Sequence, residues 1–144
     1  MMDGIATGER TRPSGWELRL AAAIEAARDR PFVWGKHDCP TFAFETRTAL
    51  TGGADVAALW RGRYRTALGG HRVMRRLGWP SLEAMGRALL GPPLPSIHLA
   101  QRGDLVLANF GVGFGVCLGV QAAGMAPAGL MLIPIAGCAL AWRI

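Results

Sequence analysis

The sequence is poor in cysteine and tyrosine, and it lacks several patterns that carry chemistry. Its 144 residues include three cysteines and one tyrosine. Cys39, Cys117 and Cys138 are too few and too widely spaced for a disulfide framework or a CxxC zinc site, so we expect free thiols. No glycine-rich phosphate loop, paired-carboxylate site or metal-ligand cluster is convincing. We therefore expect no cofactor and no metal.

One long segment also lacks charged residues altogether, and another lacks acidic residues. Between Leu105 and Trp142 the sequence has no charged residue. An apolar stretch of ~20 residues can span a bilayer, so this segment has to be considered as a membrane hairpin. Pro127, Pro134 and repeated glycines are poor helix formers, which favours a buried sheet and no membrane span.

The second segment lacks acidic residues but is rich in arginine. No acid lies between Asp55 and Glu83, where six arginines gather: Arg61, Arg63, Arg65, Arg72, Arg75 and Arg76. A basic cluster of this kind can bind nucleic acid through phosphates. It is more often a solvated helix face or a docking surface for an acidic partner, and we rank nucleic-acid binding last.

Length and composition predict one globular domain. We expect residues 1–13, which are polar, to form a flexible N-terminus and residues 14–144 to form the domain. The opening residues lack the apolar stretch of a signal peptide, so synthesis in the cytoplasm is expected.

The first part of the chain is predicted to be helical. Ser14 and Glu17 have the spacing of a capping box, which predicts a helix over 15–28. Asp38 is a good N-cap for a second helix that should reach Leu50 and stop at the glycines that follow. Two shorter helices are expected at 70–77 and 81–90.

After the proline-rich break at 91–95 the pattern becomes extended. Strands are expected at 105–109, 114–121, 129–134 and 139–143. The order predicts an α+β fold with N-terminal helices packed on a C-terminal antiparallel sheet or half-barrel.

The segment Phe32-Val33-Trp34-Gly35-Lys36-His37-Asp38-Cys39 places a thiol at the amino end of the second predicted helix. A helix amino terminus carries partial positive charge, which stabilises a thiolate. Cys39 is therefore a candidate nucleophile. The alternative is a buried cysteine that acts as a small apolar residue.

This segment resembles the nucleophile motif of the NlpC/P60 cell-wall peptidases, a papain-like family. Two further matches support the resemblance: Arg102-Gly103-Asp104-Leu105-Val106 resembles the family's turn and strand, and Gly115-Val116-Cys117-Leu118-Gly119 resembles its next strand. The resemblance implies a papain-like fold in which the thiol is paired with a histidine on the second strand, and that histidine is oriented by a polar group on the next.

The sequence departs from this pattern at both supporting positions. Alignment of the second strand places Gly113 where the histidine would stand, and nothing polar lies in 130–135. The candidate bases that remain are His37, which could equally be a turn residue bonded to backbone, and His98, which follows the proline-rich break. His71 lies among arginines and is expected on a solvated helix face.

The family resemblance implies a setting in the tail tips of phages and gene transfer agents, where related domains open peptidoglycan. One hypothesis is a virion tail-tip or hub component with a peptidase-like domain acting on peptidoglycan. Another is a non-catalytic adaptor that docks on other tail-tip or hub proteins. Exposed Trp60, Tyr64 or Trp79 beside arginines would favour the adaptor. The alternatives are that Trp79 packs at a helix entry and that Trp60 closes a loop over the core.

Overall fold

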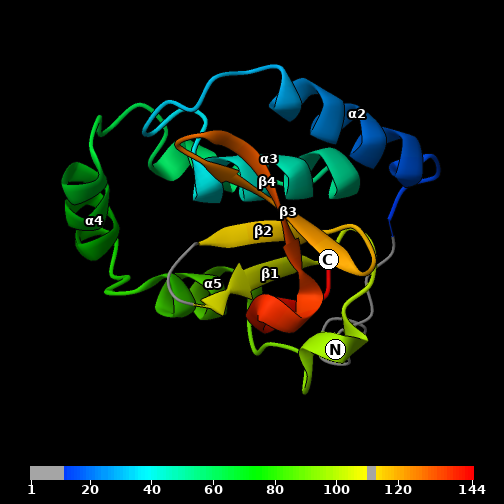
Figure 1. Cartoon of the computed structure of the whole chain (residues 1–144). Coiled ribbons are helices and arrows are strands. Elements are labelled where there is room, and N and C mark those ends of the chain that lie inside the picture. Colours follow the sequence, from blue (N-terminus) through cyan, green and yellow to red (C-terminus); the bar gives the residue numbers. More distant parts are fainter. Residues whose placement is uncertain (1–11, 110–112) are drawn as a thin grey trace.

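The structure is a computed structural model that describes residues 12–109 and 113–144, and its fold is α+β, as predicted (Figure 1). The described helices come first: α2 (Trp16–Arg28), α3 (Cys39–Thr51), α4 (Ala67–Arg76) and α5 (Leu82–Leu90). The strands follow: β1 (Leu105–Ala108), β2 (Phe114–Cys117), β3 (Gln121–Ala126), β4 (Gly129–Pro134) and β5 (Cys138–Trp142). Residues 1–11 lie outside the described residues, so a flexible N-terminus over 1–13 stays a prediction.

The strands form one antiparallel sheet in the order β4-β3-β2-β1-β5. β1 lies between β2 and the last strand, with Val106 opposite Gly115 on one side and Ala141 on the other. The antiparallel sheet predicted for the C-terminal half is confirmed. β4 is one edge of this sheet and β5 is the other.

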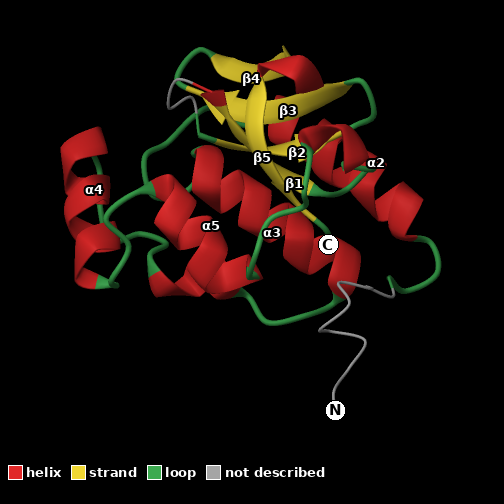
Figure 2. Ribbon diagram, turned by 90° about the horizontal axis from the view of Figure 1, so that it is seen from below, coloured by secondary structure: helices red, strands yellow, loops and turns green. Residues whose placement is uncertain are grey.

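Helices α3 and α5 lie on one face of the sheet, and α4 lies at its side (Figure 2). Leu105 and Leu107 belong to the large core shared with the helices, whereas Val106 between them belongs to a smaller cluster on the opposite face. This alternation is what a pleated strand produces when both of its faces are covered. Short 3₁₀ helices, η2 (Ile97–Leu99) and η4 (Ile135–Gly137), contact each other, and η2 also contacts β5.

Helix ends that depend on local chemistry agree with the sequence at α3 and α5 and differ at α2 and α4. The helix expected to begin at residue 70 begins at Ala67, where the Thr66 side chain accepts from the Gly69 N–H and caps it. Asp38 caps α3, Gly52 ends it in the left-handed conformation, and Ser81 caps α5. The predicted capping box at Ser14 is wrong, because the N-cap of α2 is Gly15 at φ 83 and no side chain caps this helix. Glycine reaches that backbone conformation without the strain that a serine would suffer.

The sequence prediction of one long strand over 114–121 is also wrong. The chain turns after β2 at Gly119, which has φ 124, and a separate strand β3 begins at Gln121. β3 has the sequence Gln-Ala-Ala-Gly-Met-Ala, and alanine and glycine have low strand propensity. Pairing with β2 and β4 on both sides makes this segment a strand in spite of its composition.

Within the described ranges, no helix combines the length and the apolar character needed to cross a membrane. The described parts of the uncharged segment, which raised the question of a membrane hairpin, contain the five strands of the sheet.

Candidate functional site

The turn before α3 is held by the buried carboxylate of Asp38. One oxygen of Asp38 accepts hydrogen bonds from the Gly35 N–H at 2.9 Å and from the Tyr64 hydroxyl at 2.5 Å. The other oxygen accepts from the Thr41 N–H at 3.2 Å, which caps the helix. Cys39 is thereby fixed as the first residue of α3.

The thiol of Cys39 lies against the backbone of Gly113, just before β2. A Cβ built on Gly113 would be 2.3 Å from Sγ and 3.1 Å from Cβ of Cys39. Gly113 also has φ 104, a conformation that other residues rarely adopt. The position at which the family resemblance would put a histidine therefore has no room for a side chain.

The acidity of the thiol is set by burial and not by the helix terminus. Burial, together with a smaller effect of the negative charge of Asp38, raises the pKa of Cys39 to about 12. The N–H of Phe114 acts in the opposite direction with a smaller effect. Desolvation of the charged form outweighs the partial charge of the helix terminus, and the role of Cys39 as a nucleophile stays a prediction.

His37 is buried and bonded to α2. Its Nε2 donates to the Ala27 carbonyl of α2 at 3.1 Å, and its ring packs edge-on against Phe42. Burial lowers the pKa of His37, so the ring is held neutral. His37 thus acts as a turn histidine bonded to backbone, which was the alternative interpretation of its place in the sequence.

His98 lies at the end of β1 that is remote from Cys39. It is exposed on η2, and the carbonyl of its neighbour Leu99 accepts from Arg143, which in turn bonds Asp104 before β1. Gly113 instead pairs with Ala108 at the other end of that strand. Neither His37 nor His98 is brought to the thiol.

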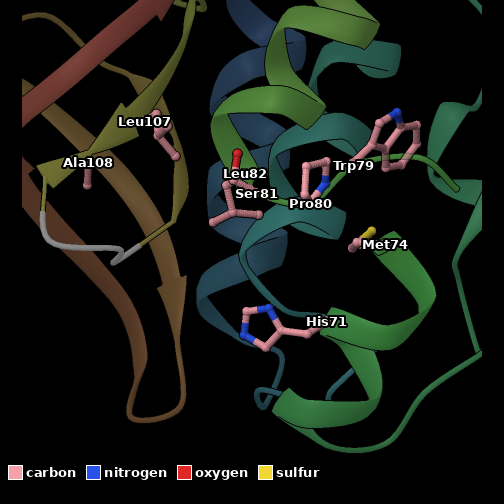
Figure 3. Close-up of a pocket in the computed structure, with 8 residues that line it drawn as sticks. All are labelled: His71, Met74, Trp79, Pro80, Ser81, Leu82, Leu107 and Ala108. Carbon is pink, nitrogen blue, oxygen red and sulfur yellow. The ribbon is translucent and has the colours of Figure 1, made fainter. Parts of the chain in front are cut away.

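The third histidine lies at a pocket on the thiol side of the molecule. His71 of α4, Met74, Trp79 and Leu82 of α5 line a largely apolar cavity of about 340 Å³ together with the end of β1 (Figure 3). Leu82 also lies 3.8 Å from the Cβ position built on Gly113, so this cavity adjoins the thiol. The described residues show no hydrogen bond between His71 and Cys39.

The aromatic residues considered as exposed docking anchors are buried. Trp60 is fully buried and its indole N–H donates to Thr41 at 3.0 Å, while Trp79 packs edge-on against it. Tyr64 is also buried, and its hydroxyl donates a hydrogen bond to Asp38. No local pattern in the sequence signals that Tyr64 would reach Asp38, because the two residues are brought together only by the fold.

Only one member of the arginine cluster forms ion pairs with acidic residues in the part of the chain that the structure describes. Arg61 forms ion pairs with Glu45 and Asp55, both at 2.8 Å. The five other members are exposed and pair with no acid in the part of the chain that the structure describes: Arg63, Arg65, Arg72, Arg75 and Arg76.

Across the described ranges no group of three or more histidine, cysteine or acidic residues could hold a metal ion. No curated protein matches the chain. A family described as "Domain of unknown function (DUF6950)" matches residues 11–144, and the chain belongs to this family.

Proposed function

We propose that the chain is a non-hydrolytic relative of the NlpC/P60 peptidases that serves as a structural adaptor in a phage-like tail tip. The observation that carries this proposal is the contact between Cys39 and Gly113. A cysteine peptidase needs a base within hydrogen-bond reach of the thiol. Here the space beside Sγ is filled by the backbone of a residue that cannot carry one.

The arrangement of elements supports the family part of the proposal. A cysteine begins a helix, that helix packs on a sheet, and the thiol meets the start of the second strand of that sheet. This is the placement that the resemblance to NlpC/P60 peptidases implies for a nucleophile and its base. The tail-tip setting comes from the same resemblance.

The thiol itself supports the non-hydrolytic part. A pKa of about 12 leaves a negligible thiolate fraction at neutral pH, and the thiolate is the nucleophilic form. His37 is bonded to α2 and His98 lies beyond the opposite end of β1. His71 lines the cavity that adjoins the thiol, but no hydrogen bond joins it to Cys39 among the described residues. What remains is a folded scaffold with an apolar cavity and a basic surface, which suits binding.

We expect purified wild-type protein to release no fragments from peptidoglycan sacculi or soluble muropeptides, and Cys39→Ala to behave identically. Products are measured by liquid chromatography and mass spectrometry, with an active peptidoglycan amidase run in parallel to validate the assay. Fragments released by the wild type but not by Cys39→Ala would contradict the proposal. Circular dichroism of both proteins ensures that folded chains are compared.

A further inference from the structure

A second cavity, which we call the Trp34 pocket, lies between two loops. The loop before α3 contributes Phe32, Val33, Trp34 and Lys36, and the loop before α4 contributes Tyr64 and Arg65. Its volume is about 540 Å³. None of the catalytic candidates discussed above lines it.

The floor of the Trp34 pocket is held in place by contacts between its two loops. The Gly62 N–H donates to the Gly35 carbonyl at 2.9 Å. A Cβ on Gly35 would be 2.5 Å from the Tyr64 carbonyl oxygen, so the loops touch backbone to backbone. The Tyr64 hydroxyl is anchored on Asp38. A pocket fixed in this way loses little conformational entropy when a ligand binds.

The wall of the pocket presents apolar surface to solvent. Val33 is 43% exposed and Trp34 is 36% exposed, although most large apolar residues nearby are buried. Phe32 packs edge-on against Trp34, with ring centroids 4.7 Å apart, and supports the indole. An exposed tryptophan beside an arginine is typical of the residues that dominate protein interfaces.

The rim of the pocket is positively charged. Lys36 and Arg65 are exposed, pair with no acid in the described ranges, and no acidic residue lines the cavity. The neighbouring Arg61, in contrast, is neutralised by two acids. Lys36 and Arg65 therefore leave unpaired positive charge at the rim of the Trp34 pocket, which favours a negatively charged occupant.

We propose that the Trp34 pocket binds an acidic peptide segment of a partner protein. An apolar side chain of the segment packs on Trp34 and Val33, while flanking carboxylates meet Lys36 and Arg65. The aliphatic Val33 beside the indole suits a side chain better than a stacked base. This inference rests on the proposed adaptor function, because it names the chemistry of the partner.

The test uses fluorescein-labelled nine-residue peptides with three glutamates on each side of a central triplet that contains leucine, phenylalanine or tryptophan. Fluorescence anisotropy with the full chain should detect binding of at least one peptide in the micromolar range. Replacement of its glutamates by glutamine should weaken binding by about tenfold or more, because charge-assisted hydrogen bonds are lost.

Matched variants separate the pocket from the overall charge. Lys36→Glu with Arg65→Glu should weaken binding by about tenfold or more, whereas Arg75→Glu with Arg76→Glu makes the same charge change on α4 and should weaken it by about threefold or less. Trp34→Ala should also weaken binding by about tenfold, and Leu132→Ala, on the exposed edge strand β4, should leave it unchanged.

Three results would overturn the inference: no peptide binds, both charge-reversed pairs weaken binding equally, or a single-stranded oligonucleotide binds tighter than every peptide and depends on the same pocket residues. Binding is measured for the wild type and for Cys39→Ala. If no peptide binds and no peptidoglycan is hydrolysed, only the assignment of the Trp34 pocket is wrong, and the proposed function stands. Hydrolysis that depends on Cys39 would remove the proposed function and leave the binding result standing.

Discussion

Replacement of Asp104 by alanine is expected to lower the free energy of unfolding by about 3–5 kcal/mol, the usual cost of removing one partner from a buried ion pair. Asp104 is completely buried at the turn before β1. Its two oxygens accept from the side chains of Arg12 at 3.1 Å and Arg143 at 3.0 Å. They also accept from the backbone N–H groups of Gln101 at 2.8 Å and Ile144 at 3.0 Å.

The large effect follows from what the alanine variant leaves behind. Arg12 has a side chain that is only 9% exposed, so its guanidinium would stay largely buried without its carboxylate. The Ile144 N–H, which closes the C-terminus on the turn before β1, would also lose its acceptor. Buried donors without acceptors carry the full cost of desolvation.

Chemical denaturation of the wild type and Asp104→Ala measures the difference. The control is Glu83→Gln, which removes an exposed ion pair to Arg87 within α5 and should change the free energy of unfolding by about 0.5 kcal/mol or less. A loss below about 1 kcal/mol for Asp104→Ala would contradict a structural role for the carboxylate.

The second large effect is expected at Gly113, where alanine should lower the free energy of unfolding by about 2–5 kcal/mol. The new Cβ would meet Sγ of Cys39 at 2.3 Å, and overpacking of this kind costs about 1–3 kcal/mol. The positive φ of 104 adds about 1–2 kcal/mol for any residue with a Cβ.

Two comparisons separate these contributions. Gly119 has φ 124 and no atom within 4 Å of a built Cβ, so Gly119→Ala should show only the backbone cost of about 1–2 kcal/mol. In the double variant Gly113→Ala with Cys39→Ala the sulfur is gone, and the loss should be about 1–2 kcal/mol smaller than the sum of the single losses. Simple additivity would mean that residues 39 and 113 do not touch.

Features that depend on neighbouring residues in sequence were predictable. The Asp38 and Ser81 caps follow from local hydrogen bonding, and the α+β order follows from the change of periodicity after the proline-rich break. β3 was missed because its alanines and glycine have no strand preference, and pairing with two neighbours decides its structure.

The site was predictable in its location and not in its chemistry. The motif before Cys39 indicated a thiol at the start of a helix, and the structure has it there. The raised pKa of that thiol and the contact of Tyr64 with Asp38 depend on residues distant in sequence, which no local pattern encodes. For the same reason, the sequence alone could not decide whether Trp60 is a surface anchor or a core residue.

The most direct test of the unactivated thiol is the pH dependence of Cys39 alkylation by iodoacetamide, followed from pH 5 to pH 10 by peptide mass mapping. Because burial raises the pKa of Cys39 to about 12, the thiol is the favoured form over this range, and the rate should rise with pH without a plateau below pH 9. A rate that levels off with an inflection between pH 5 and pH 7 would show a stabilised thiolate and would contradict the unactivated thiol.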